Sequence, residues 1–128
     1  MQSLIKSHDK KFANAFDRRI QNEAKGNCVV TTWLGAWMIK DATIRVWLNA
    51  SLEERAKRRS KINGLEMEKE MRLLKQYDQL THDHFKQVYG IDINNHDIFD
   101  IELNSEKLTI SEMVKIITAL AKARQQKR

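Results

Sequence analysis

The sequence has 128 residues, of which 41% are hydrophobic and 31% charged, and 23 Lys and Arg against 17 Asp and Glu give a net charge of +6. This length suits one domain, and the absence of proline with only four glycines favours long helices and few loops. No apolar run approaches the roughly 20 residues of a bilayer-spanning helix, so a membrane-spanning protein is excluded. The positive charge suits polyanionic partners such as nucleotide phosphates or RNA.

Cys28 is the only cysteine in the sequence, so a disulfide within the chain is excluded. Its apolar neighbours predict a buried thiol that acts as a small hydrophobic side chain. A reducing compartment fits this cysteine usage, and the start of the chain lacks the pattern of a signal peptide. The sequence therefore predicts a soluble, cytoplasmic protein with no membrane partner.

The first predicted elements are a helix over residues 9–24 and a strand at Cys28–Thr32. Apolar side chains recur four apart along the helix, and Gly26 provides a stop signal after it. The strand begins with consecutive apolar residues, so we expect both of its faces to be buried.

A second strand is predicted at Thr43–Leu48, and a basic helix follows it as far as Gly64. Ser51 and Glu54 have the spacing of a capping box. In that arrangement the serine oxygen accepts a backbone N–H, and the glutamate reaches back to the serine N–H.

The rest of the chain predicts a long helix over residues 65–88, a polar loop over 91–97 and a strand over 99–103. A last helix begins after a second capping box at residues 109–112. Strands that alternate with helices predict a parallel sheet with helices on its faces.

Five segments, in order and at matching spacing, resemble the archaeal-type cytidylate kinases, within the P-loop nucleoside monophosphate kinases. The segments are Lys25–Val30, Leu34–Trp37, Val46–Arg58, Lys86–Ile93 and Phe99–Ser105. The resemblance covers nearly the whole chain and implies an α/β fold, a partial P-loop kinase-like three-layer sandwich with a parallel sheet and a helical lid.

The resemblance also divides the single domain, residues 1–128, into four parts. They are part of the monophosphate-binding helix region (1–26), two core strands (27–51), a lid-like helical hairpin (52–88), and the last strand with the C-terminal helix (89–128).

The family's activity implies ATP and Mg²⁺ as cofactors, and nucleoside mono- and triphosphates as ligands. Phosphoryl transfer of this kind depends on positioning and on positive charge around the transferred group. Arginine suits this because its planar fork meets two phosphate oxygens at once. By resemblance Arg55 and Arg58 are the predicted catalytic residues, and Arg59 and Lys61 are predicted to bind nucleotide. The alternative for all of them is a solvated helix face.

Three further residues are candidates for nucleotide binding. Trp33 could stack a base or form a pocket wall, or it could simply pack, whereas Trp37 is expected in the core. Asn104 could meet the adenine edge or serve as a turn residue. Asp17 could touch the monophosphate or belong to a surface charge cluster. No metal site is predicted, because His82 and His84 diverge around a helix.

Four positions depart from the family, which typically has arginine there: Trp33, Ile62, Tyr77 and His84. The basic side chains that could substitute are Arg59, Lys61, Lys75 and Lys86.

The motif Gly-x-x-x-x-Gly-Lys-Ser/Thr occurs nowhere in the sequence, although the family holds ATP phosphates with it. In these folds the first strand lies between those expected at Cys28–Thr32 and Thr43–Leu48. Without it, the chain would close the gap, pair with itself or a second chain, or be one piece of a longer or split protein. We expect one of the last two.

The sequence therefore predicts ATP-dependent phosphoryl transfer to a nucleoside monophosphate (CMP or dCMP), only where another chain or segment supplies a phosphate loop. The isolated chain is expected to be inactive. The alternative is a non-catalytic basic module derived from the same fold that binds nucleotides or RNA, in association with a ribonucleoprotein.

Overall fold

The computed structural model describes residues 18–126. The chain divides into two compact units, one of Met1–Ala42 with His82–Ile98 and one of Thr43–Thr81 with Phe99–Arg128. None of the helices described is long and apolar enough to cross a bilayer.

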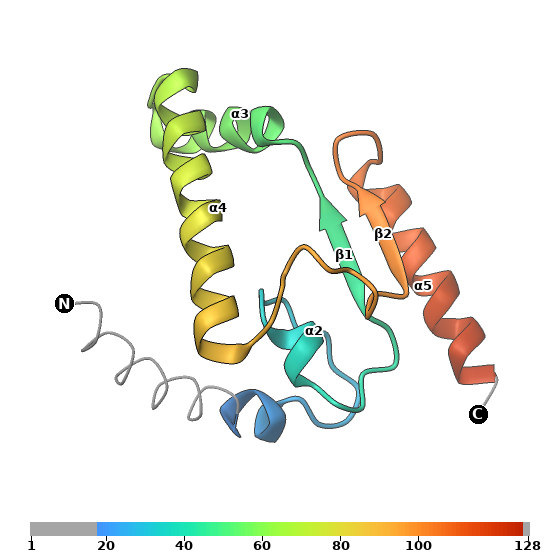
Figure 1. Ribbon diagram of the computed structural model, residues 1–128. Coiled ribbons are helices and arrows are strands. Elements are labelled where there is room, and N and C mark those ends of the chain that lie inside the picture. Colours follow the sequence, from blue (N-terminus) through green and yellow to red (C-terminus); the bar gives the residue numbers. More distant parts are fainter. Residues whose placement is uncertain (1–17, 127–128) are drawn as a thin grey trace. The chain divides into compact units, whose positions relative to one another are not determined.

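The second unit contains a parallel pair of strands, β1 (Val46–Asn49) and β2 (Ile101–Asn104), which lie side by side in Figure 1. The register aligns Val46 with Ile101 and Asn49 with Asn104. A parallel β-sheet was predicted from the alternation of strands and helices, and the structure confirms it.

The basic helix of the second unit, α3 (Leu52–Asn63), begins just beyond the carboxyl end of β1 (Figure 1). Ser51 caps it, because its Oγ accepts the Glu54 N–H at 3.1 Å. The other half of the predicted capping box is wrong: the Ser51 N–H donates to Glu106 after β2. The Glu54 carboxylate instead accepts from Arg58 Nε at 3.3 Å.

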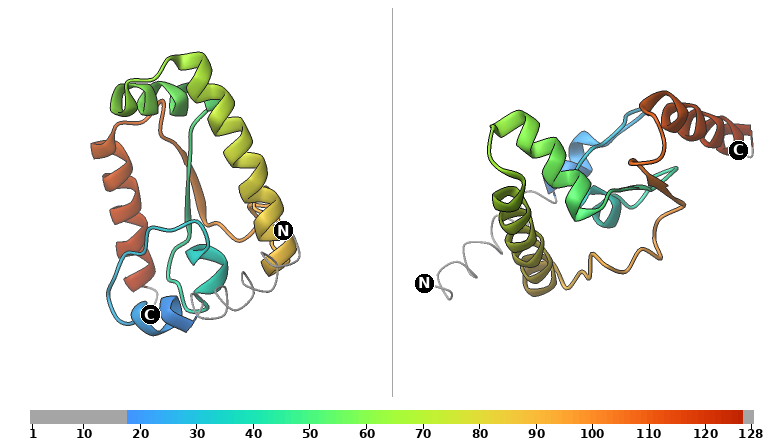
Figure 2. Two further views of the ribbon diagram at one scale, coloured as in Figure 1. Left: turned by 90° about the vertical axis from the view of Figure 1, so that its left-hand side faces the viewer. Right: turned by 90° about the horizontal axis from the view of Figure 1, so that it is seen from above.

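A sharp turn joins α3 to α4 (Met67–Tyr89), as both views of Figure 2 show. Gly64 ends α3 with φ of 71°, a left-handed conformation that glycine adopts without steric cost. The Ser60 hydroxyl donates to the Leu65 carbonyl at 2.6 Å across this turn. The predicted basic helix and long helix are therefore both confirmed, with ends shifted by one or two residues.

The last helix, α5 (Ile110–Gln126), begins with a complete capping box. The Glu112 N–H donates to Thr109 Oγ1 at 3.1 Å, and the Thr109 N–H donates to Glu112 Oε1 at 2.9 Å. Hydrogen bonds of the Glu112 carboxyl, first with the Thr109 backbone N–H and then with the Thr109 side chain, lower its pKa. This capping box was predicted from the sequence and is confirmed.

Arg124, near the end of α5, fixes that helix to the start of the sheet. Its Nη2 lies 2.8 Å from Asp100 Oδ1, and its Nη1 donates to the Thr43 carbonyl at 3.0 Å. The backbone N–H of Arg45 also donates to Asp100 Oδ2 at 2.7 Å. The Arg45 N–H first, and then the Arg124 guanidinium, hold the pKa of Asp100 below its usual value.

The first unit has a helical stretch at residues 18–23, the short helix α2 (Gly35–Met38) and the last part of α4. Its core contains Leu34, Phe85 and Ile93, and Trp37 packs against them. The predicted core position of Trp37 is confirmed. The start of the helix predicted over residues 9–24 lies outside the described residues.

The strand predicted at Cys28–Thr32 is wrong, since these residues form no regular element. Cys28 is exposed rather than buried, and Val29 is 91% exposed. Within residues 18–126 the sheet has two strands, so this segment pairs with neither. Its side chains favour strands, but a strand needs a partner for its backbone groups and a surface to cover.

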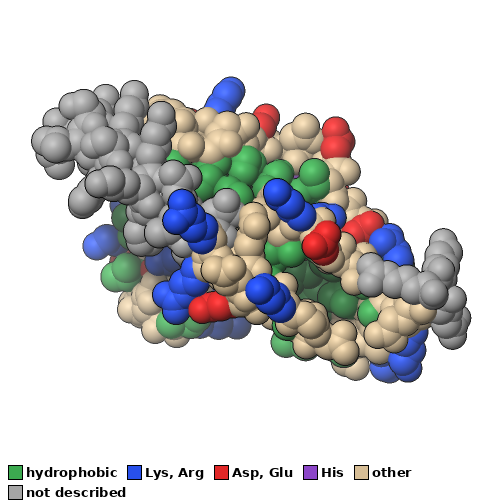
Figure 3. Space-filling model, turned by 90° about the horizontal axis from the view of Figure 1, so that it is seen from below, with side chains coloured by type: hydrophobic (Ala, Val, Ile, Leu, Met, Phe, Trp, Pro, Cys, Tyr) green, Lys and Arg blue, Asp and Glu red, His purple; other side chains and the backbone are tan. Residues whose placement is uncertain are grey.

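Both units expose large hydrophobic side chains, and Figure 3 shows such side chains beside Lys and Arg on one face. Those more than half exposed are Val29, Leu48, Ile62, Tyr77, Leu80, Ile110 and Val114.

Candidate functional site

Arg55, in the first turns of α3, is tied to the protein through its whole guanidinium. Its Nη1 and Nη2 lie 3.0 and 2.8 Å from the two carboxylate oxygens of Asp78 in α4. Its Nε donates to the Ala50 carbonyl at 3.2 Å. Arg55 thus joins the end of β1, α3 and α4, and a phosphate would have to displace Asp78 to meet the end of its fork.

Arg58 connects α3 to the turn after β2. Its Nη1 and Nη2 lie 3.2 Å from Ser105 Oγ and 3.0 Å from the Ser105 carbonyl, and its Nε contacts Glu54. The Ser105 hydroxyl in turn donates to the Asn49 carbonyl at 2.9 Å. The second predicted catalytic arginine therefore also has protein oxygens in front of each guanidinium nitrogen.

Arg59 is held differently, by one atom only. Its Nε lies 3.2 Å from Oε2 of Glu70, whose side chain is 0% exposed, while the Arg59 side chain is 51% exposed. The other Glu70 oxygen accepts from Asn63 Nδ2 at 3.0 Å. The two terminal amino groups of Arg59 have no partner among residues 18–126, so they remain available to an anion.

Lys61 is exposed and has no ion-pair partner within the described part of the chain. Its flexible ammonium carries positive charge without a fixed direction, unlike the arginine fork. Of the basic side chains predicted to bind nucleotide, Arg59 is positioned and Lys61 is not.

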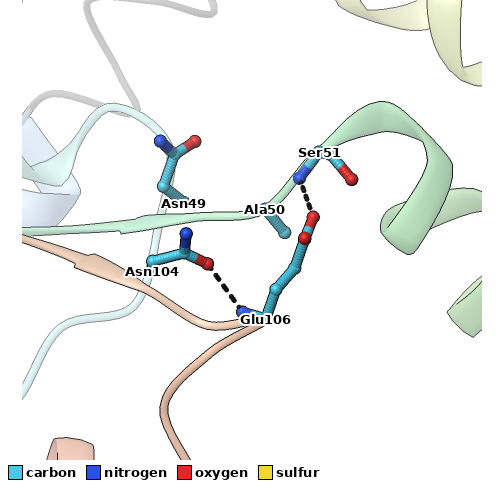
Figure 4. A pocket seen from close by; sticks show the side chains of 5 residues that line it. All are labelled: Asn49, Ala50, Ser51, Asn104 and Glu106. Carbon is cyan, nitrogen blue, oxygen red and sulfur yellow. Dashed lines mark hydrogen bonds between the residues drawn. The ribbon is translucent and has the colours of Figure 1, made fainter.

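A shallow pocket lies at the carboxyl ends of both strands, where ligands commonly bind in parallel α/β sheets. The residues that line it are Asn49, Ala50, Ser51, Asn104 and Glu106 (Figure 4). Asn104 Oδ1 accepts the Glu106 N–H at 2.9 Å, so the turn role considered for Asn104 is real. Its amide still borders the pocket, which keeps a contact with a base edge open.

Glu106 fills the end of this pocket nearest to α3. The Ser51 hydroxyl first, and the Ser51 N–H second, lower the pKa of the Glu106 carboxyl. Arg58 adds a smaller electrostatic contribution in the same direction. An anionic carboxylate therefore occupies the amino end of α3, where the helix dipole favours negative charge.

Trp33 belongs to the other unit and is 40% exposed. Its ring meets Phe85 edge-on, with centroids 6.3 Å apart. The side chain both packs against the core and presents surface, so packing and base contact are both compatible with its position. Asp17, the remaining predicted residue, lies outside the described residues.

Two of the four positions at which the resemblance implies arginine are exposed hydrophobic or aromatic side chains here. Ile62 is 82% exposed on α3, and Tyr77 is 51% exposed on α4. His84 instead contacts the rings of Phe85 and Tyr89 in the first unit.

The described residues contain no preformed cluster of three side chains for a cation. No group of three His, Cys, Asp or Glu among them could hold a metal ion. Mg²⁺ commonly binds through substrate phosphates and water, with one or two carboxylates from the protein. A magnesium ion that arrives with the nucleotide phosphates needs no such group of three side chains.

Sequence reasoning missed the acidic partners of the arginines. Asp78, Glu70 and Glu106 lie 23, 11 and 48 residues from the arginine with which each interacts. Such separations leave no local spacing signal, in contrast to Glu54 and Arg58, which are four apart on one helix.

Comparisons with known proteins follow the same order of segments. A model of the cytidylate kinase-like family matches residues 2–107. A cytidylate kinase of Pyrococcus horikoshii is 30% identical over 102 residues, which cover 80% of this chain and 53% of that protein. One of Staphylothermus marinus is 34% identical over 119 residues, covering 90% and 66%. One of Sulfurisphaera tokodaii is 31% identical over 125 residues, covering 91% and 69%.

The chain spans about half to two thirds of the length of the curated relatives described above. No solved structure matches it significantly. The family match covers most of the sequence, including β1, α3, α4 and β2. The resemblance inferred from five short segments is thereby confirmed, and the chain belongs to the cytidylate kinase-like family.

Proposed function

We propose that this chain contributes the phosphate-binding lid to ATP-dependent phosphoryl transfer onto a nucleoside monophosphate, CMP or dCMP. A phosphate loop from another chain or from a segment outside this sequence completes the site. The observation that carries the proposal is the placement of α3. This helix begins shortly after the carboxyl end of β1, and its Arg58 contacts Ser105, which lies between the pocket residues Asn104 and Glu106 in the sequence.

The predicted basic residues of α3 and the Asn104 amide have separate roles in this proposal. Arg55 and Arg58 stabilise the transferred group once phosphate oxygens displace their protein partners, and Arg59 and Lys61 hold nucleotide phosphates. The Asn104 amide meets the edge of the base. ATP with Mg²⁺ is the donor, and the missing phosphate loop is needed because backbone N–H groups of such a loop cradle the donor phosphates.

A coupled nucleoside diphosphate assay tests this function. CMP, dCMP, UMP and AMP are offered with ATP and Mg²⁺ to the purified chain, with and without a polypeptide that carries strand, Gly-x-x-x-x-Gly-Lys-Ser/Thr loop and helix. Turnover is expected only in the mixture. A loop polypeptide with its lysine replaced by alanine is the matched control. Turnover by the chain alone, or none in the mixture, contradicts the proposal.

A second candidate is a non-catalytic module that binds RNA through its basic surface. The net charge of +6 and the exposed Lys61, which has no ion-pair partner among residues 18–126, favour it. Such binding releases counterions, so affinity should fall steeply between about 50 and 200 mM salt. Filter binding with a single-stranded RNA over this range is the test, and absent or salt-insensitive binding removes the candidate.

A further inference from the structure

We infer that Arg59 is the arginine of α3 that can bind phosphate without giving up a protein partner, and that Glu70 is the residue that positions it. This inference rests on the proposed function and deepens it, because it assigns different roles to three arginines on one helix. The role of Glu70 follows from its burial and its two contacts.

The three guanidinium groups differ in what their outer nitrogens meet. Both terminal amino groups of Arg55 face Asp78, and both of Arg58 face Ser105. Arg59 makes its ion pair through Nε alone, at 3.2 Å. Its terminal amino groups therefore present the end of the fork, which can meet two oxygens of one phosphate.

Glu70 is the buried charge that fixes this geometry. Its side chain is 0% exposed, and a carboxylate in such a place is costly unless it is paired and hydrogen-bonded. Both requirements are met, because Arg59 Nε contacts Oε2 and Asn63 Nδ2 contacts Oε1. The guanidinium of Arg59 is thus anchored at one edge and half-exposed at the other.

The anchor lies where α3 turns into α4. Asn63 is the last residue of α3, and Glu70 lies in the first turn of α4, where negative charge is favoured. Ile62 and Tyr77 carry no charge at positions where the family pattern has arginine. Arg59 is placed to supply a guanidinium in their stead. Lys61 lacks an anchor of this kind among the described residues.

Binding of inorganic tripolyphosphate to the full chain, measured by calorimetry at low salt, tests the role of Arg59. Arg59→Ala should weaken binding about ten- to hundredfold, because a charge-assisted bidentate contact is lost. Arg59→Lys keeps the charge but not the fork and should recover only part of the loss. Lys57→Ala, an equal change of charge on the same helix, is the control and should change the Kd less than about threefold.

Glu70→Gln tests positioning against charge. Removal of a negative charge by itself would tighten binding of an anion, so a weakening of about three- to tenfold identifies a positioning role. In the Arg59→Ala background the same change should no longer weaken binding, because there is no guanidinium left to position. A thermal melt shows whether Glu70→Gln folds. If it does not fold, the inference is tested by the binding of tripolyphosphate to Arg59→Lys.

Three results would overturn this inference: no binding by the unaltered chain, equal loss in Arg59→Ala and Lys57→Ala, or tighter binding by Glu70→Gln. Each would leave the proposed function standing if the mixture with the loop polypeptide still phosphorylates CMP. Conversely, the expected binding results without any transfer in that mixture would overturn the proposed function alone.

Discussion

The segment Cys28–Thr32 and the strand β1 are two short runs of β-favouring side chains, and they lie in different surroundings. β1 pairs with β2 along its length, and Leu103 of β2 is only 5% exposed. Cys28–Thr32 has no pairing strand among the described residues, and Val29 is almost fully exposed. The comparison teaches that strand propensity is the capacity to fit a pleated surface, and that a partner must provide that surface.

The ends of the paired strands are secured as well as their middle. The Asp100 N–H donates to the Arg45 carbonyl at 2.8 Å, and the Ser105 N–H donates to the Asn49 carbonyl at 2.8 Å. Among the described residues, Cys28–Thr32 has no backbone hydrogen bonds of this kind to a neighbouring strand.

Amide hydrogen exchange should separate the two segments by the largest margin. The backbone amides that hydrogen-bond between β1 and β2 should exchange at least about a thousandfold more slowly than in an unfolded chain. Their exchange requires global unfolding, which costs about 5 kcal/mol. The amides of Cys28–Thr32 should exchange nearly as fast as in an unfolded chain. Exchange monitored by NMR or mass spectrometry gives both values, and strong protection of Cys28–Thr32 would break the comparison. Protection gained only with the loop polypeptide would sharpen it.

Truncation of the buried side chain in the paired region should cost far more than truncation in the unpaired one. Leu103→Ala should lower the free energy of unfolding by about 2–5 kcal/mol, since it removes buried contacts and leaves a cavity. Val29→Ala should change it by less than about 0.5 kcal/mol. Urea denaturation measures both. Equal costs for the two variants would show that Val29 is buried in solution.

Loss of a helix cap should have a smaller effect. Thr109→Ala removes the acceptor of the Glu112 N–H at the start of α5, the helix that follows the paired strand β2. We expect a loss of about 0.5–2 kcal/mol by urea denaturation. Thr109→Ser keeps the oxygen and serves as the control. Equal destabilisation by the serine variant would show that the hydroxyl contact is not responsible.

Acidification should weaken the paired region by the smallest amount. The pKa of Asp100 is lowered in the folded chain, so its contribution is present above its unfolded value of 3.8 and is lost as the pH falls through the lower folded value. Asp100→Asn should flatten the dependence of stability on pH below about 4. Thermal melts between pH 2 and pH 6 would reveal it, with Asp97→Asn as the matched change on the exposed loop. Parallel curves for the original chain and Asp100→Asn would rule out this contribution.

Much of the helical structure could be predicted because its signals are local. The capping box at Thr109 and Glu112, the left-handed turn at Gly64 and the basic face of α3 each depend on residues close in sequence. The capping box predicted at Ser51 was only half right. The Ser51 N–H donates to Glu106, which is 55 residues away in sequence, and not to Glu54.

The amino-acid sequence alone determined the family, the order of helices and β-rich runs, the absence of a phosphate-loop motif and the concentration of positive charge on α3. Tertiary structure alone decided which β-rich run pairs, and which arginine meets Asp78, Ser105 or Glu70. The physical reason is one of range. Caps and turns are satisfied within a few residues, whereas strand pairing and buried charges need partners that only the folded chain brings within hydrogen-bond distance.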